Sequence, residues 1–305
     1  MSKPSKAKLF RGLSMSTEAL TQLQTFTEIA ALREQVQAWR SAGERIAFVP
    51  TMGNLHDGHL SLVILAKQHA TRVVASIFVN PTQFGPKEDF ASYPRTLAAD
   101  QALLAGGGCD VVFAPTVDAM YPALDVNSSK FAIDVGMMGN ILCGAARPGH
   151  FSGVATVVAK LFNIVQADVA IFGEKDFQQL LVLRNLVRQF NFPLEIIGAP
   201  TIREASGLAR SSRNQYLSAD ERTQARVIYA TLLQMRDKRQ QGIDCEQVQS
   251  DALTALKAAG LNPDYAVLRD AQTLDLVNKS SKSEVAMIAA RLGKARLIDN
   301  IYWDC

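Results

Sequence analysis

Short runs of consecutive apolar residues alternate with longer segments of helical periodicity, and this alternation restricts the fold more than any other feature of the chain. The apolar runs lie at residues 46–49, 73–79, 111–114, 169–172 and 194–198. The helical segments follow Gly58 or lie at residues 96–105, 151–165 and 176–189. Strands that are apolar at nearly every position have both faces covered, so the pattern predicts an α/β fold with a Rossmann-like, doubly wound parallel sheet.

The part of the chain beyond residue 203 follows a different pattern. A polar loop spans residues 204–216, and Ser218-Ala-Asp-Glu221 then fits a capping box at the start of a helix. A second helix is expected at about 245–259. Three strands without intervening helices are expected at 265–268, 285–290 and 295–301, which predicts a small antiparallel sheet. We therefore expect a Rossmann-like domain at 21–203 and a smaller C-terminal α+β domain at 204–305.

The charge distribution argues against nucleic acid as a partner. The net charge is +3, but Lys3, Lys6, Lys8 and Arg11 supply four positive charges before the first acidic residue, so the rest of the chain is close to neutral. A protein that binds a polyanion broadly needs a basic surface, which this composition does not provide. We expect residues 1–20 to form a disordered basic extension.

Signals for membrane insertion, secretion and metal or redox chemistry of cysteine are missing from the sequence. No segment is apolar over the length of a membrane span, and the basic N-terminus lacks the apolar core of a signal peptide. Cys109, Cys143, Cys245 and Cys305 are scattered without a C-x-x-C pair. We therefore expect a cytoplasmic protein with no membrane partner.

The segment Pro50-Thr-Met-Gly-Asn-Leu-His56-Asp-Gly-His59 joins the first apolar run to the helix that follows it. His56 and His59 lie three residues apart, at the mouth and in the first turn of that helix, beside its unpaired backbone N–H groups. Because helix N-termini bind phosphates, the pair predicts an anion site. Two alternatives stay open at this point: a metal site, which would need further ligands, and a structural turn made by Gly53 and Gly58.

Polar side chains also follow other predicted strands, and parallel strands place their carboxyl ends along one ligand-binding edge of a sheet. Lys175 offers a charge for a phosphate, and Gln83 and Gln179 offer amides suited to a small hydroxy acid. Gln179 lies three residues after Asp176 and should share a helix face with it, whereas Gln178 should not. Ser211-Ser-Arg-Asn214 offers hydroxyls and a guanidinium for a triphosphate. Each has a plainer alternative as a surface side chain or polar loop. P-loop, G-x-G-x-x-G and G-x-S-x-G motifs are absent from the sequence.

Six segments of the sequence carry a resemblance to a known family. They are Met52-Gly-Asn-Leu-His-Asp-Gly-His59, Phe78-Val-Asn-Pro-Thr-Gln-Phe84, Tyr93-Pro-Arg-Thr96, Arg147-Pro-Gly-His-Phe151, Gly173-Glu-Lys-Asp-Phe-Gln-Gln179 and Ser211-Ser-Arg-Asn214. In this order and spacing they resemble the pantoate–β-alanine ligase (pantothenate synthetase) family, over about residues 27–300. The histidine motif alone marks the wider HxGH nucleotidylyltransferase superfamily, and the role of His150 stays open.

The resemblance implies ATP-dependent condensation of (R)-pantoate with β-alanine. The implied products are pantothenate, AMP and diphosphate, formed through an enzyme-bound pantoyl adenylate. Mg²⁺ is expected to arrive with ATP. No protein ligand for it is assigned, and Asp100 is considered as a helper ligand. The family further implies a homodimer whose partners are the small-molecule substrates pantoate, β-alanine and ATP.

The same resemblance implies roles for individual residues. Charge on the phosphates would be stabilised by His56, His59, Lys175, Ser211, Ser212 and Arg213, with His59 as a proton donor. ATP would be bound by Met52, Gly53, Asn54, Leu55, His56, Asp57, Gly58, His59, Gly173, Glu174, Lys175, Asp176, Ile202, Arg210, Ser211, Ser212 and Arg213. Pantoate and β-alanine would be held by Asn80, Gln83 and Gln179.

One residue departs from the family pattern, and two other functions stay open on the sequence. The family generally has an apolar residue where Arg210 stands. A contact that the family makes to ATP through the backbone of this residue is therefore better founded here than one made through its side chain. A nucleotidylyltransferase that moves AMP to a phosphorylated cofactor precursor would share the histidine motif without needing Gln83 and Gln179 where they are. A catalytically silent nucleotide-binding protein is the other alternative, which ATP turnover would exclude.

Overall fold

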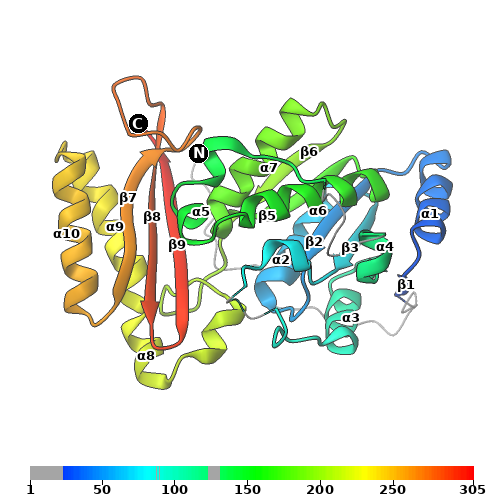
Figure 1. The fold of residues 1–305 in the computed structure, drawn as a ribbon, viewed down its shortest axis with the longest axis horizontal. Helices are drawn as coiled ribbons and strands as arrows, with labels where there is room; N and C mark the ends of the chain where they lie inside the picture. The colour runs from blue at the N-terminus through cyan, green and yellow to red at the C-terminus, as the bar shows by residue number, and fades with distance from the viewer. Residues whose placement is uncertain (1–22, 87, 89, 123–130) are drawn as a thin grey trace, which may run out of the picture.

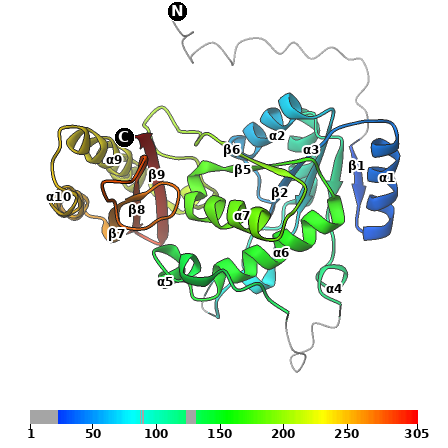
Figure 2. The ribbon, with the colours of Figure 1, turned by 90° about the horizontal axis from the view of Figure 1, so that it is seen from above.

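Two sheets organise the part of the chain that the structure describes (Figure 1). The structure is a computed structural model that describes residues 23–86, 88, 90–122 and 131–305, so the basic extension expected at residues 1–20 lies outside the described residues. A six-stranded sheet with its helices makes up one side of the molecule, and a three-stranded sheet with its helices lies beside it. Figure 2 shows the same two parts from above.

The larger sheet is parallel throughout and has the strand order β1-β4-β3-β2-β5-β6. Its strands are β1 (Gln24–Phe26), β2 (Ile46–Thr51), β3 (Arg72–Ile77), β4 (Val111–Phe113), β5 (Val169–Gly173) and β6 (Glu195–Ala199). The chain builds outward from β2 through β3 to β4, then returns to the other side of β2 to form β5 and β6. The order therefore reverses between β2 and β5, which is where doubly wound sheets bind ligands.

Helices cover both faces of this sheet. One face packs against α1 (Ile29–Ser41), α6 (His150–Val165) and α7 (Phe177–Gln189), through residues such as Leu32, Phe162 and Leu183. The other face packs against α2 (Asp57–His69) and α3 (Leu97–Gly106), through Val63 and Leu104. Short helices lie in the connections: α4 (Val117–Met120), α5 (Cys143–Ala146), and the 3₁₀ turns η1 (Pro81–Gln83), η2 (Gly136–Gly139), η3 (Glu174–Asp176) and η4 (Ser212–Tyr216).

The smaller sheet is antiparallel, in the order β7-β8-β9. It contains β7 (Asn262–Asp270), β8 (Ser283–Leu292) and β9 (Ala295–Asp304), and the chain reaches it through α8 (Ala219–Gln224), α9 (Arg226–Gln240) and α10 (Cys245–Ala258). Helices α9 and α10 bury one face of the sheet. The opposite face packs against Phe177 and Leu181 of α7, so the sheet stands between its own helices and the larger part of the molecule (Figure 1).

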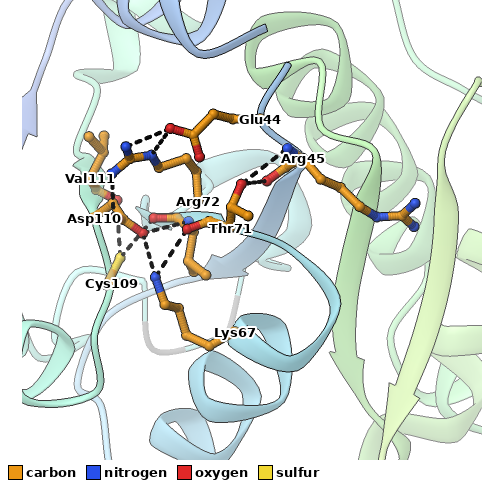
Figure 3. Close-up of polar contacts among 9 residues, drawn as sticks. Glu44, Arg45, Lys67, Thr71, Arg72, Cys109, Asp110 and Val111 are labelled. Atoms are coloured by element: carbon orange, nitrogen blue, oxygen red, sulfur yellow. Dashed lines mark hydrogen bonds and ion pairs between the residues drawn. The ribbon is translucent and has the colours of Figure 1, made fainter. Parts of the chain in front are cut away.

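A polar network fastens the amino ends of three parallel strands, at the edge of the sheet opposite their carboxyl ends (Figure 3). The Arg72 guanidinium lies 2.6 Å from Glu44 and 3.3 Å from Asp110, and Lys67 Nζ lies 3.1 Å from the same aspartate. Cys109 is buried beside this network, and burial raises the pKa of its thiol to about 12. Its sulfhydryl is therefore protonated and unreactive at neutral pH.

The fold class predicted from the sequence is confirmed, with differences at particular elements. Strand β1 and helix α1 were not predicted, and the helix expected from Ser218 is two helices, because the chain turns at Ala225. The capping box between Ser218 and Glu221 is present. Among the helices of the described residues, none has the length and apolar character needed to cross a membrane.

Candidate active site

A cleft of about 260 Å³ opens at the carboxyl ends of β2 and β5. It is lined by residues of the parallel-sheet part and of the loop that follows β6. Most of the site residues expected from the sequence line this one cleft: Met52, His56, Gly58, His59, Asn80, Gln83, Gly173, Lys175, Asp176, Gln179, Ile202, Arg210, Ser211, Ser212 and Arg213. Those that do not line it are Gly53, Asn54, Leu55, Asp57 and Glu174, which lie within the segments that carry the lining residues.

The two motif histidines form the N-terminal cap of α2. His56 Nδ1 accepts a hydrogen bond from Gly58 N at 3.1 Å, and His59 Nδ1 accepts one from His56 N at 3.3 Å. The two ring centroids are 4.2 Å apart. An acceptor Nδ1 places the proton of a neutral imidazole on Nε2, so each ring keeps one N–H donor for a ligand.

Both histidines are held in the neutral form. Burial lowers the pKa of His59 to about 3, and the neighbouring His56 and Lys175 act in the same direction. Burial also lowers the pKa of His56, followed by the positive charges of Lys175 and Arg210. Before a nucleotide arrives, His59 is therefore a hydrogen-bond donor rather than a cationic acid. An anionic phosphate beside it would act in the opposite direction and raise this pKa.

Cationic side chains reach the cleft from two directions. Lys175 lies in η3, directly after β5, and its side chain is 18% exposed. Arg210 reaches the start of α2 from the loop after β6, and one of its terminal nitrogens lies 3.0 Å from Asp57. Among the described residues its Nε has no hydrogen-bond partner. Arg210, the residue that departs from the family pattern, therefore has its side chain at the cleft, with its Nε–H group available as a hydrogen-bond donor.

The loop that carries Ser211 and Arg213 is ordered by its own hydrogen bonds. Ser211 caps η4 by accepting a hydrogen bond from Arg213 N at 3.3 Å. Asn214 is buried, and its side-chain amide donates to Ala209 O at 3.0 Å. Arg203 and Ala209 form an antiparallel bridge at the base of the loop. These contacts hold the hydroxyls and the guanidinium against the cleft.

Asp100, which was considered as a helper ligand for Mg²⁺, does not line the cleft. It is 3% exposed, and its two carboxylate oxygens accept hydrogen bonds from Asn54 N at 3.0 Å and Leu55 N at 2.8 Å. A third bond comes from the Thr96 hydroxyl at 3.1 Å. Gly53 and Asn54 both have positive φ, at 81° and 52°, and a Cβ on Gly53 would meet Asp100 Oδ2 at 3.0 Å. Asp100 thus holds the loop before His56, and its oxygens are committed to that task.

Gln83 also lines the cleft and belongs to a hydrogen-bond network that includes Asn80. Its Nε2 donates to Met52 Sδ at 3.1 Å, and its Oε1 accepts from Asn80 Nδ2 at 3.0 Å. Asn80 is 1% exposed and also binds Tyr121 OH and Gly153 O. Its amide therefore supports Gln83, and Asn80 also lines the cleft, where its predicted contact with substrate stays a prediction.

His150 links Gln83 to a half-buried ion pair. Its Nδ1 lies 2.9 Å from Gln83 O, and its Nε2 lies 2.8 Å from Arg147. Because an arginine always donates, Nε2 is the acceptor and Nδ1 carries the proton. Arg147 in turn pairs with both carboxylate oxygens of Glu88. Burial, followed by the charge of Arg147, lowers the pKa of His150 to about 4.

The two glutamines that follow Asp176 differ as their positions predict. Gln179 lines the cleft together with Asp176. Gln178 is 2% exposed, donates to Met138 O and Ile141 O, and accepts from Cys143 N. The spacing of three residues therefore identifies the glutamine that a ligand can reach.

Comparison with known proteins decides the family. A model described as pantoate-beta-alanine ligase matches residues 24–302. The chain belongs to the pantoate–β-alanine ligase family. It is 54% identical over 280 residues to the pantothenate synthetase of Stenotrophomonas maltophilia (strain K279a), covering 92% of this chain and 99% of that one. It is 53% identical over 282 residues to that of Shewanella amazonensis, covering 92% and 100%.

Solved structures of the ligase family share the fold. The crystal structure of pantothenate synthetase from Thermus thermophilus matches with a TM-score of 0.84 and 45% identity, over 92% of this chain and 99% of that one. The pantoate-beta-alanine ligase from Francisella tularensis, complexed with beta-gamma ATP and beta-alanine, matches with a TM-score of 0.72 and 35% identity, over 92% and 97%.

Sequence reasoning missed part of the cleft of this ligase. One wall is apolar, and it is formed by Val154, Val157, Val158 and Leu161 of α6, with Phe78 and Phe84 nearby. The apolar character of α6 was evident from the sequence, but an apolar helix face that lines a cleft has the same pattern as one that packs in the core. The Arg147-Pro-Gly-His150 turn was visible too, and only the contact between His150 and the main chain of Gln83 reveals its role.

The described residues contain no preformed metal-binding site made of protein side chains. No group of three or more His, Cys, Asp or Glu side chains among them is arranged to hold a metal ion. Asp176 lines the cleft, whereas the Asp100 oxygens are occupied. This donor set fits a Mg²⁺ ion that is bound mainly by phosphate oxygens and water, with at most one carboxylate from the protein.

Proposed function

We propose that this protein condenses (R)-pantoate with β-alanine to give pantothenate, AMP and diphosphate, through an enzyme-bound pantoyl adenylate. The observation that carries the proposal is that one cleft is lined both by donors suited to phosphates, at His59 and Lys175, and by the amides of Gln83 and Gln179. The complex of the Francisella tularensis relative with beta-gamma ATP and beta-alanine supports the identity of two of the substrates. The family supports pantoate as the third.

The chemistry requires activation of the pantoate carboxylate. A carboxylate does not acylate an amine at neutral pH, because its oxygen is a poor leaving group. In the first step a carboxylate oxygen attacks the α-phosphorus of ATP, and the bond to the bridging oxygen breaks to release diphosphate. In the second step the free amine of β-alanine attacks the acyl carbon, AMP leaves, and the amine loses a proton. Neither step needs a nucleophile from the enzyme.

The residues of the cleft have separate tasks in this scheme. The Nε2–H groups of His56 and His59 and the Lys175 ammonium stabilise charge on the phosphates as diphosphate departs. Ser211, Ser212 and Arg213, which line the same cleft, hold the leaving phosphates. Gln83 and Gln179 bind pantoate and orient its carboxylate toward the α-phosphorus. Mg²⁺ that enters with ATP would neutralise part of the phosphate charge, with Asp176 as the cleft carboxylate able to contact it.

We also propose that residues 204–305 act as a lid over the adenylate, with the loop at 204–216 as the part that closes while β9 stays joined to η3 through Asn300. The apolar wall from α6 and a closed lid would together exclude water, which otherwise hydrolyses an acyl phosphate. ATP and pantoate added together should protect the loop at 204–216 from limited proteolysis. Cleavage at an unchanged rate would contradict lid closure. The family resemblance further leads us to propose a homodimer in the cytoplasm, which gel filtration and fractionation would test.

The adenylate is tested by pantoate-dependent exchange of labelled diphosphate into ATP, with Mg²⁺ present and β-alanine left out. Exchange is expected, because adenylation is reversible when the acceptor amine is absent. Adding β-alanine should then give pantothenate and AMP in equal amounts. No exchange in folded protein that binds ATP would refute the adenylate, and it would favour transfer of AMP to another acceptor or a silent nucleotide-binding protein.

A further inference from the structure

Asn300 reaches the active site from the smaller sheet. It lies in β9 and is 5% exposed. Its side-chain amide donates to the carbonyl oxygens of Glu174 at 3.0 Å and Lys175 at 2.9 Å. Both carbonyls belong to η3, the turn between β5 and α7 that presents Lys175 to the cleft. One side chain of the C-terminal sheet therefore holds the main chain of a turn in the parallel-sheet part.

Asn300 is itself fixed by a buried ion pair. Its backbone N–H donates to Asp299 Oδ1 at 2.8 Å, and Arg203 binds both oxygens of that carboxylate, at 2.5 and 2.9 Å. Arg203 also donates to Asn300 O at 3.3 Å. The guanidinium lies 3.8 Å above the ring of Tyr229. These contacts leave the Asn300 backbone little freedom, so its amide is a rigid support.

The Lys175 side chain depends on that support for its direction. Within the described part of the chain, Lys175 Nζ makes one ion-pair contact, to Asp176 Oδ2, and the distance of 4.0 Å is longer than a hydrogen bond. No side chain caps η3. The main chain of the turn therefore sets where the ammonium points, and small displacements of a group that contacts a reacting phosphate are costly.

We propose that Asn300 is a positioning residue, which aims the Lys175 ammonium at the nucleotide phosphates by fixing both carbonyls of its turn. This inference rests on the proposed function, in which Lys175 contacts ATP. It also gives the smaller sheet a part in nucleotide binding that does not require any of its residues to touch the nucleotide.

A double-mutant cycle on ATP affinity tests the proposal. Asn300→Leu keeps the size of the side chain and removes both hydrogen bonds. In the otherwise unchanged protein it should raise the Kd for ATP, measured by calorimetry without pantoate, about tenfold. In a Lys175→Ala background the same change should raise the Kd less than about twofold, because the group that Asn300 positions is gone. Equal losses in both backgrounds would overturn the proposal, and so would no loss.

Two further variants keep the test decisive. Asn300→Ala has no side-chain donor, so it also lacks both bonds, and it replaces Asn300→Leu in the cycle if urea denaturation shows that the leucine variant is unfolded. Tyr302→Phe is the matched control, because Tyr302 OH contacts the Glu174 side chain at 3.0 Å from the same strand without touching the turn's main chain. Its Kd should stay within about twofold, and a tenfold rise would contradict the role of the carbonyls. ATP binding is measured without turnover, so failure of the exchange reaction would refute the proposed function separately.

Discussion

Replacing Asp100 by Asn should loosen the loop that precedes His56. The carboxylate accepts hydrogen bonds from Asn54 N and Leu55 N on different oxygens. A carboxamide has one oxygen, so at least one of the two N–H groups would face an NH₂ group instead. A hydrogen bond to a charged group contributes about 1.5–3 kcal/mol, and an unpaired buried donor adds to the loss. We therefore expect Asp100→Asn to lower the free energy of unfolding by about 2–4 kcal/mol.

The same substitution should slow adenylation. The loop of Gly53 and Asn54 leads directly into the cap made by His56, so a shift of the loop displaces the ring that we propose to contact the phosphates. A displacement of about 1 Å costs on the order of a hundredfold in rate. Urea denaturation and pantoate-dependent exchange of diphosphate into ATP, each measured over a range of Mg²⁺ concentrations, provide the assay.

The Mg²⁺ series separates loop support from metal binding. If Asp100 supports the loop, the variant keeps its apparent KM for Mg²⁺ while its rate stays low. Thr96→Val is the matched control, because it removes the hydroxyl contact at 3.1 Å and leaves both backbone bonds. It should cost about 1 kcal/mol and little rate. Unchanged unfolding of Asp100→Asn, with a rate restored by added Mg²⁺, would refute this reasoning and return Asp100 to a metal-binding role.

Three other changes probe the same cleft. His59→Ala should lower the exchange rate at least about a hundredfold, as loss of one preorganised donor does. A near-normal rate would refute the proposed role of His59 in stabilising phosphate charge. The folded pKa of His150 is about 4 against an ordinary value of 6.5, so the unfolded chain binds more protons between these pH values and stability falls as pH drops through that window. About 2 kcal/mol should be lost from this group between pH 7.5 and 5, and urea denaturation of His150→Gln should show a pH dependence smaller by that amount. In Gly153→Ala, the new Cβ would lie 2.4 Å from Thr82 O, so about 1–3 kcal/mol of stability and part of the pantoate affinity should be lost, whereas Gly106→Ala meets nothing within 4 Å and should not destabilise. Equal unfolding free energies for the two glycine variants would contradict the packing argument.

The site was predictable from the sequence where its groups are local to strand ends. His56 and Lys175 follow different strands, and the parallel arrangement brings both strand ends to one edge without any knowledge of long-range contacts. Gln179 was separated from Gln178 by helical spacing alone. These predictions required only a period and a strand direction, which the apolar runs supply.

The supporting residues could not be found in the same way. Asp100 and Asn300 bind backbone groups. Because nearly every residue carries the same backbone N–H and carbonyl, the residue type at the partner position does not reveal the contact. Their partners lie 45 to 126 residues away. Helix α1 could have been predicted in part, since Ile29, Leu32 and Val36 have helical spacing. Its N-terminus could not, because the N-cap residue Glu28 makes no side-chain cap. Strand β1 has three residues, too few for a periodic pattern.

The two cleft histidines cap helix α2 and, in the proposed function, also contact the nucleotide, so the nucleotide site depends on an intact helix end. Each ring is anchored through Nδ1 to the first turn of α2, so neither can swing away from the cleft without giving up a backbone contact. The entropy of orienting these donors is therefore lost during folding and not again when ATP binds. Acid that protonates Nδ1 would also remove the acceptor that the cap needs. Fraying of the helix end and release of the nucleotide should consequently occur as a single acid-induced event.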